Sequence, residues 1–222
     1  MNSKEIIEKY VSLLMIGDLK TLQTLFYGQP NINTPIEGEI SGKIAFKNYV
    51  SKRKDWLNTK NAKPELFNYI SSDDRIVAEF IVYFEKEGKT IDLPVVLVAD
   101  LEYDLVSKIR TYYSSWPLLG KHIGRKPMLK PVEYLDEPDI IQSYMEGLMK
   151  ADKDLVLSLF EKDAYVREPS GSLYKHEGEF GRKEFYSSAL GSGGIPLKHC
   201  TATYDGKSFA VEYLIAQRSV AL

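Results

Sequence analysis

The chain has 222 residues, of which 44% are hydrophobic and 27% are charged, and its formal net charge is −2 at pH 7. This is the composition of an ordinary globular protein, and the length suits two domains of about 100 residues each. The charge excludes a basic nucleic-acid-binding surface, and no run approaches the roughly 20 apolar residues of a membrane span or forms the apolar core of a signal peptide. We therefore expect a cytoplasmic protein that has neither nucleic acid nor membrane as a partner.

Cysteine and histidine are too scarce for a dedicated metal site. The chain has one cysteine, Cys200, and three dispersed histidines, His122, His176 and His199. A single cysteine cannot form a disulfide within the chain, and the spacing matches no Cys/His ligand pattern. We expect no metal and no other cofactor.

A long internal repeat indicates the domain organisation. The segment 6–26, IIEKYVSLLMIGDLKTLQTLF, reappears at 140–160 as IIQSYMEGLMKADKDLVLSLF. At a constant offset the identical pairs are Ile6/Ile140, Ile7/Ile141, Tyr10/Tyr144, Leu14/Leu148, Met15/Met149, Asp18/Asp152, Leu25/Leu159 and Phe26/Phe160. So long an offset predicts tandem domains, because solenoid units are only roughly 20–50 residues long.

Each copy starts with two helices. Apolar residues recur at helical spacing over 6–14, and Ser3 is the expected N-cap of this helix. The pattern breaks at Gly17, and a second short helix is expected over 19–26.

Strands and a third helix follow. Extended segments at 31–35 and 165–169 each end in a proline, and a helix is expected to start at Gly42 in copy one and at Gly181 in copy two. After Pro64, copy one is rich in β-branched and aromatic residues separated by turn signals, which is typical of a strand meander. This element order predicts an α+β fold with helices on one face of an antiparallel sheet. The domains are expected at 1–127 and 139–222, joined by a proline-rich linker at 128–138.

The second copy is expected to lack its last strands. Glu79 in V-A-E-F matches Glu212 in A-V-E-Y, but copy one continues for two further strands after Glu79, whereas little sequence follows Glu212. Either another chain completes the second sheet or this copy is shortened.

These residues resemble the SnoaL-like, nuclear transport factor 2-like superfamily. The marks of the resemblance are the run 10–26, the helix starts at Gly42 and Gly181, and the strand glutamates Glu79 and Glu212. The resemblance implies two tandem cone-shaped (cystatin-like) domains, in which a curved antiparallel sheet wraps on helices and encloses a pocket. The superfamily includes isomerases, cyclases, dehydratases, hydrolases and pure binding modules, so the fold leaves the activity open.

Copy two is also locally similar to the ketosteroid isomerases. In that family a tyrosine of the first helix donates a hydrogen bond to the developing enolate, and a carboxylate just before a proline moves the proton. The resemblance places these catalytic roles on Tyr144 and on Glu168 in V-R-E-P. A carboxylate in a pocket wall gains a raised pKa and can act as a base, and a neutral phenol can stabilise an oxyanion. Copy one has Thr34 in place of Glu168, and threonine cannot act as a base.

Five further residues are candidate ligand contacts: Tyr10, Tyr112, Trp116, His176 and Glu212. Tyr112 and Trp116 belong to an aromatic-rich stretch that would line an apolar cavity, or serve as ordinary core or as a dimer face. Tyr10 is the first-helix tyrosine of copy one, and it has packing as its alternative role. His176 is either an acid–base partner or an exposed hairpin residue, and Glu212 lies either in a pocket or at the surface.

The expected function is the binding of a small, largely apolar molecule. If the protein is an enzyme, the resemblance implies cofactor-free proton transfer next to a carbonyl, of the isomerase or polyketide cyclase type. The alternative is a non-catalytic ligand-binding or dimerisation module. The duplication further suggests that the two copies form a pseudo-dimer within the chain, or that the chain forms a homodimer.

Overall fold

The computed structural model describes residues 2–215, and the chain divides into two compact units. Unit 1 comprises Met1–Lys126 with the short segments Pro169–Ser172 and Thr203–Ala210, and unit 2 comprises Pro127–Glu168, Leu173–Ala202 and Val211–Leu222. Each unit is described by itself below, and the last two strands of the chain are described with unit 2.

Unit 1 starts with two helices, α1 (Ser3–Ile16) and α2 (Leu19–Thr24), as the periodicity predicts. The N-cap of α1 is Asn2 rather than the expected Ser3. The Asn2 side chain accepts a hydrogen bond from the Glu5 backbone N–H at 2.9 Å, and the Glu5 carboxylate accepts one from the Asn2 backbone N–H at 3.0 Å. This reciprocal pair is a capping box. Gly17 ends α1 with a φ of 74°, a left-handed conformation that glycine adopts without strain.

A six-stranded sheet and a third helix complete the framework of unit 1. The strands are β1 (Asn31–Thr34), β2 (Gly38–Ser41), β3 (Lys63–Ser71), β4 (Arg75–Lys86), β5 (Lys89–Glu102) and β6 (Leu105–Tyr112), and the helix α3 (Lys43–Thr59) lies between β2 and β3 in the chain. The strand order is β2-β1-β6-β5-β4-β3. Neighbouring strands are antiparallel except β1 and β6, which run parallel. The antiparallel sheet predicted from the sequence therefore contains one parallel pair. Strand β6 ends the meander beside β1, from which it is separated in the chain by α3 and the four strands β2 to β5.

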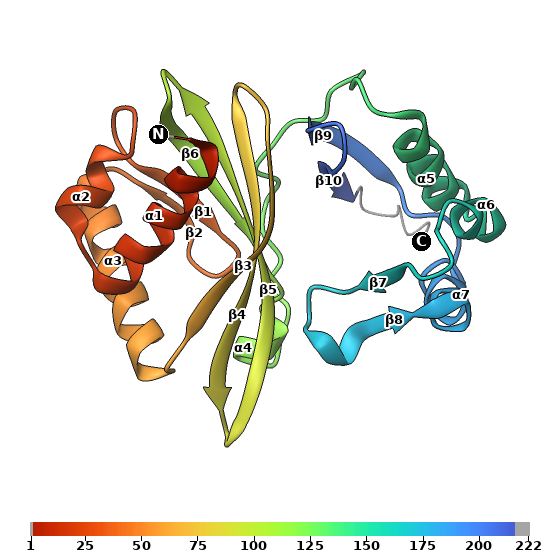
Figure 1. The fold of residues 1–222 in the computed structure, drawn as a ribbon, viewed down its shortest axis with the longest axis horizontal. Helices are drawn as coiled ribbons and strands as arrows, with labels where there is room; N and C mark the ends of the chain where they lie inside the picture. The colour runs from red at the N-terminus through yellow and green to blue at the C-terminus, as the bar shows by residue number, and fades with distance from the viewer. Residues whose placement is uncertain (1, 216–222) are drawn as a thin grey trace, which may run out of the picture. The chain divides into compact units, whose positions relative to one another are not determined.

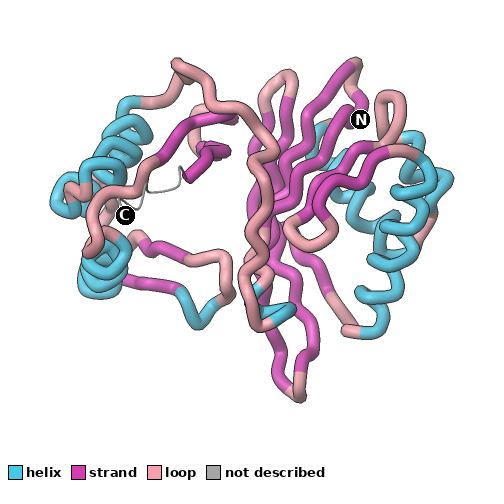
Figure 2. Tube along the Cα trace, turned by 180° about the vertical axis from the view of Figure 1, so that it is seen from behind, coloured by secondary structure: helices cyan, strands magenta, loops and turns pink. Residues whose placement is uncertain are grey.

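Helices α1, α2 and α3 cover one face of this sheet (Figure 1), and the view from behind shows the same layering (Figure 2). Aromatic side chains fill the space between the layers. The Phe26 ring lies edge-on to both Tyr10 and Phe46, with ring centroids 6.3 Å and 5.4 Å apart respectively. Edge-to-face pairs of this kind add about 0.5–1.5 kcal/mol to the free energy of unfolding beyond the area they bury. The predicted α+β class is confirmed.

A charged cluster connects three strands of the sheet. Arg110 on β6 is 1% exposed and donates hydrogen bonds to both carboxylate oxygens of Asp100 on β5, one of them at 2.9 Å. Arg75 on β4 donates a further hydrogen bond to Asp100 at 2.8 Å. Burial would raise the pKa of Asp100, but the hydrogen bonds from Arg110 and Arg75 hold it below its ordinary value. The buried guanidinium is therefore paired and hydrogen-bonded, as a buried charge must be.

Unit 2 repeats the element order of unit 1 up to the second strand of the meander. Its elements are α5 (Asp139–Lys150), α6 (Lys153–Ser158), β7 (Tyr165–Arg167), the 3-10 helix η1 (Ser172–Tyr174), β8 (Lys175–Glu177), α7 (Gly178–Ala189), β9 (Leu197–Tyr204) and β10 (Phe209–Ile215). Strand β7 pairs with β8, and β9 pairs with β10, as two separate sheets. Helix α7 begins at Gly178, so Gly181, which was expected at the helix start, lies inside it.

Within residues 2–215, unit 2 has no strands in the places that β5 and β6 take in unit 1. The second copy is thus partial over the described part of the chain. The prediction about its missing last strands also concerns residues 216–222, which lie outside the described residues.

Candidate functional site

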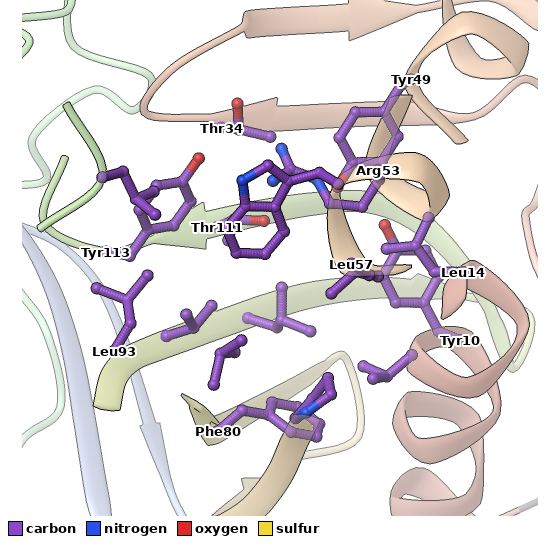
Figure 3. A pocket seen from close by; sticks show the side chains of 17 residues that line it. Tyr10, Leu14, Thr34, Tyr49, Arg53, Leu57, Phe80, Leu93, Thr111 and Tyr113 are labelled. Carbon is purple, nitrogen blue, oxygen red and sulfur yellow. The ribbon is translucent and has the colours of Figure 1, made fainter. Parts of the chain in front are cut away.

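An apolar cavity lies in unit 1, between α1, α3 and the covered face of the sheet (Figure 3). Its volume is about 100 Å³. A closed apolar cavity of about 150 Å³ in a protein core can bind benzene, so this space suits a molecule with roughly one ring. It is lined by Tyr10, Val11, Leu14, Thr34, Tyr49, Arg53, Trp56, Leu57, Pro64, Phe80, Val82, Leu93, Val95, Leu97, Thr111, Tyr113 and Leu118.

Regular secondary structure determines which side chains reach the cavity. Tyr49, Arg53, Trp56 and Leu57 recur at helical spacing along α3, so they share one face of that helix. Alternate residues of the strands point to the same side, as Leu93, Val95 and Leu97 do on β5. The short helix α4 (Trp116–Leu119) contributes Leu118 to the lining.

Polar groups of the cavity gather around Arg53. Its guanidinium lies over the ring of Tyr49 at 5.4 Å and over that of Trp56 at 5.8 Å. It also donates a hydrogen bond of 2.7 Å to Glu37, in the turn between β1 and β2, and 17% of the Arg53 side chain is exposed. Thr34 donates a hydrogen bond to the Glu37 carboxylate and accepts one from the Glu37 backbone N–H at 2.9 Å, which holds this turn against the cavity.

Two tyrosine hydroxyls face this region without a hydrogen bond. The hydroxyl oxygens of Tyr10 and Tyr113 are buried, and no described residue makes a hydrogen bond of ordinary geometry with either. Their polar neighbours include Tyr49 for Tyr10 and Thr34 for Tyr113, and a side-chain hydrogen-bond interaction within each pair contributes to the pKa of the tyrosine, but neither pair reaches ordinary hydrogen-bond geometry. Figure 3 shows the Tyr113 hydroxyl on the Thr34 side of the cavity. Buried polar groups normally have partners, so these two donors are open to a ligand.

The three tyrosines of the cavity are neutral hydrogen-bond donors at physiological pH. Burial raises the pKa of Tyr10 well above its ordinary value, and the neighbouring Tyr49 raises it further. Burial also raises the pKa of Tyr49, although Arg53 acts against it. Burial raises the pKa of Tyr113 to about 12, again against the effect of Arg53. Neutral phenols of this kind can bind an oxyanion or a carbonyl oxygen.

The described lining of the cavity contains no aspartate, glutamate, histidine, cysteine or lysine. Arg53 stays protonated at all ordinary pH values, and the tyrosines hold their protons. Glu37, the carboxylate nearest to the polar end, is tied to Arg53 and Thr34. The described wall of this cavity therefore offers donors for recognition but no side chain placed as a general base.

The three candidate ligand contacts of copy one lie in different places relative to the cavity. Tyr10 lines the cavity, as expected for a pocket residue. Tyr112 is not a lining residue, because it alternates with Thr111 and Tyr113 along β6 and so points to the other face of the sheet. Trp116 in α4 is 48% exposed and stacks on His122, with ring centroids 5.4 Å apart, outside the lining.

In unit 2 the two residues proposed as catalytic, Tyr144 and Glu168, are hydrogen-bonded to different side chains. The Tyr144 and Tyr186 hydroxyls share a hydrogen bond of 2.9 Å, whereas Glu168 is hydrogen-bonded to His176 at 2.9 Å. An open apolar depression of about 360 Å³ lies around Tyr144, and Glu168 is not among its described lining residues. Glu212 on β10 accepts a hydrogen bond of 2.6 Å from Thr201 on β9. The structure thus brings Glu168 and His176 together but does not bring Tyr144 to Glu168.

Sequence reasoning missed Tyr49 and Arg53 at the polar end of the cavity. It considered Thr34 only as a residue that cannot act as a base, and Tyr113 only as one of several aromatic residues that could line a cavity. A signal for Tyr49 and Arg53 was present, because both lie on the buried stripe of α3, where a positive charge is unusual. No sequence signal distinguished Tyr113 from Tyr112, since the choice depends on the register of β6.

The described residues form neither a cluster of metal ligands nor a membrane-spanning helix. No group of three or more His, Cys, Asp or Glu side chains in residues 2–215 is arranged to hold a metal ion. No helix in the same part of the chain is long and apolar enough to cross a membrane.

No protein-family model matches the sequence, and no curated protein matches it. Solved structures do resemble it over about half of its length. An NTF2-like protein of unknown function from Cytophaga hutchinsonii is 18% identical, with a TM-score of 0.42, and the match covers 50% of this chain and 98% of that one. A putative polyketide cyclase from Sinorhizobium meliloti is 10% identical, with a TM-score of 0.41 and coverages of 49% and 94%.

The epoxide hydrolase/cyclase-like enzyme SalBIII, which has a role in pyran ring formation in the polyether salinomycin, is 15% identical, with a TM-score of 0.41 and coverages of 49% and 88%. At such identities and TM-scores these structures carry no argument about activity or ligand, which must come from the cavity itself.

Proposed function

We propose that unit 1 binds a small, largely apolar molecule that carries a hydrogen-bond acceptor, and that it binds this molecule without transforming it. The observation that carries the proposal is the pair of buried Tyr10 and Tyr113 hydroxyls at the wall of an apolar cavity, neither of which makes a hydrogen bond of ordinary geometry with a described residue. A buried donor without a partner costs about 1–3 kcal/mol, and an acceptor on a ligand would remove that cost.

The described cavity wall favours binding over catalysis, because it provides hydrogen-bond donors but no general base. Proton transfer next to a carbonyl needs a base within hydrogen-bond reach of the substrate. The described lining residues offer an arginine and neutral phenols, and the nearby Glu37 is already engaged by Arg53. Proton transfer by Glu168 in unit 2 stays a prediction, and the hydrogen bonds that hold Tyr144 and Glu168 to different partners do not favour it.

The chain contains a natural reporter for this cavity. It has two tryptophans, of which Trp56 lines the cavity and Trp116 does not. In a Trp116→Phe chain, the fluorescence of Trp56 should therefore respond to occupancy. Cyclohexanecarboxamide and cyclohexyl methyl ketone are suitable probes, because each has one saturated ring and one carbonyl acceptor; the amide does not absorb where tryptophan is excited, and the weak absorption of the ketone there is corrected with a titration of free tryptophan.

We expect saturable binding of both probes, and Val95→Phe in the same background should weaken it by roughly 10-fold or more, because the added ring occupies the apolar part of the cavity. Val96→Phe is the matched control, since Val96 follows Val95 on β5 and is not a lining residue. Failure of both probes to bind, or equal binding by the two variants, would contradict the proposal.

A further inference from the structure

Positively charged side chains surround the outer end of the cavity. A second hollow, of about 310 Å³, shares Arg53, Trp56 and Leu118 with it. The charged residues of this hollow are Lys52, Arg53, Lys60 and Lys86 against the single carboxylate of Glu37. A ligand with its apolar part in the cavity would therefore have its polar end in a region of positive potential.

Arg53 connects the two spaces. Only 17% of its side chain is exposed, and its hydrogen bond to Glu37 is 2.7 Å long. A guanidinium has five N–H donors, of which this bond occupies one. Arginine and carboxylate form charge-assisted hydrogen bonds that are roughly twice as strong as neutral ones. The partly desolvated guanidinium is thus placed to contact an anion that also meets the tyrosine hydroxyls.

We propose that the ligand of unit 1 is a carboxylic acid with a compact apolar body, whose carboxylate lies against Arg53 and the hydroxyls of Tyr10 and Tyr113. This inference rests on the proposed binding function and specifies its ligand class. A carboxylate only accepts hydrogen bonds, which matches a wall of donors. The lysines of the outer hollow repel a cationic ligand, and they leave a neutral one without an added attraction.

Glu37 opposes the preference for an acid over a neutral ligand. Substitutions of Arg53 and of Glu37 should therefore change this preference in opposite directions. Its carboxylate already compensates part of the Arg53 charge, so an incoming acid competes with it. Lys52 is exposed, and Lys60 and Lys86 are partly exposed, so the attraction of these lysines is screened by salt. Arg53 should therefore determine the preference for an acid, and the lysines should add a smaller part that salt removes.

The test compares cyclohexanecarboxylate with cyclohexanecarboxamide, which have the same shape and differ by one charge. Their dissociation constants are measured by Trp56 fluorescence in the full chain carrying Trp116→Phe. We expect the acid to bind roughly 10-fold more tightly than the amide at low salt, because hydrogen bonds to charged groups are the stronger kind. Added salt should lower this ratio without removing it.

Three variants test whether the preference for the acid depends on Arg53. Arg53→Met should bring the ratio of the two affinities close to one, and Glu37→Gln should increase it several-fold by removing the competing carboxylate. Lys47→Met is the matched control, because it removes one positive charge from an exposed position of the same helix outside the cavity and should leave the ratio unchanged. Circular dichroism confirms that each variant is folded.

The outcomes separate the two proposals. If the amide binds as tightly as the acid, the carboxylic acid inference fails and the binding function stands. A preference for the acid that survives Arg53→Met, and that Glu37→Gln leaves unchanged, also overturns the inference, because the anion then binds elsewhere. If neither probe binds to the folded chain, the binding function itself fails.

Discussion

The first-helix tyrosine illustrates how two equivalent residues can acquire different surroundings. Tyr10 and Tyr144 occupy the same place in the repeat, and each faces a tyrosine of the third helix of its copy, Tyr49 in unit 1 and Tyr186 in unit 2. The Tyr144 hydroxyl shares a hydrogen bond with Tyr186, whereas the Tyr10 hydroxyl makes none of ordinary geometry among the described residues. The Tyr144 hydroxyl is therefore satisfied within the fold, and the Tyr10 hydroxyl is the one that the proposed ligand would engage.

Replacing Tyr10 by phenylalanine should separate ligand binding from stability. Because its hydroxyl is buried and makes no hydrogen bond of ordinary geometry with a described residue, Tyr10→Phe should change the free energy of unfolding by less than about 0.5 kcal/mol, or raise it. The affinity for cyclohexanecarboxamide should fall by roughly 3- to 10-fold, the worth of one neutral hydrogen bond. Urea unfolding and Trp56 fluorescence in the Trp116→Phe background measure the two effects.

Tyr186→Phe is the control from unit 2, because it removes a hydroxyl that is hydrogen-bonded to Tyr144. It should lower the free energy of unfolding by about 0.5–1.5 kcal/mol and leave ligand affinity unchanged. A large loss of stability in Tyr10→Phe, with unchanged affinity, would show that its hydroxyl serves the fold.

At the scale of elements, periodicity predicted much of the fold, and the exceptions have local causes. The helical spacing in 6–14 and the glycine at Gly42 predicted α1 and the start of α3. Helix α7 starts at Gly178 and not at the matching Gly181, because the β8 strand before it ends at Glu177, which is the N-cap. The parallel pairing of β1 with β6 depends on contacts distant in sequence, so no local pattern could indicate it.

The start of α1 allows a direct test of a corrected prediction. Asn2 makes the capping box with Glu5, so Asn2→Ala should lower the free energy of unfolding by about 1 kcal/mol. Ser3→Ala is the natural control, because Ser3 is the first residue of the helix and not its cap, and the change should be within about 0.5 kcal/mol. Urea unfolding followed by Trp56 fluorescence in the Trp116→Phe chain measures both. If Ser3→Ala lowers the free energy of unfolding more than Asn2→Ala does, Ser3 and not Asn2 is the N-cap.

At the scale of the whole chain, the duplication shows which parts of the site could be predicted from the sequence. The element order of copy one correctly indicated the α+β fold, and Tyr10, proposed as a ligand contact, lies at the wall of the unit 1 cavity. The comparison of the two copies directed attention to Glu168, since that residue differs between the copies, and away from Thr34, which lacks a titratable group. The polar end of the cavity depends on Arg53 and on the turn at Glu37, and neither residue is part of the repeated pattern.

Thr34 and Glu168 each precede a proline and occupy matching places in the two copies, so substituting them tests which copy binds the ligand. Thr34 lines the unit 1 cavity and holds Glu37, whereas Glu168, its counterpart in unit 2, is hydrogen-bonded to His176. Thr34→Val removes a hydroxyl beside Tyr113 and releases the Glu37 carboxylate, so it should weaken cyclohexanecarboxylate binding by roughly 3- to 10-fold.

Glu168→Gln, measured in the same Trp116→Phe background, should leave this affinity within roughly two-fold and lower the free energy of unfolding by no more than about 1 kcal/mol, because the pair it breaks is partly exposed. Isothermal titration of both variants gives the affinities independently of Trp56. If Glu168→Gln weakens binding more than Thr34→Val while both remain folded, the ligand occupies unit 2. The carboxylate and Tyr144 would then become the residues to pursue.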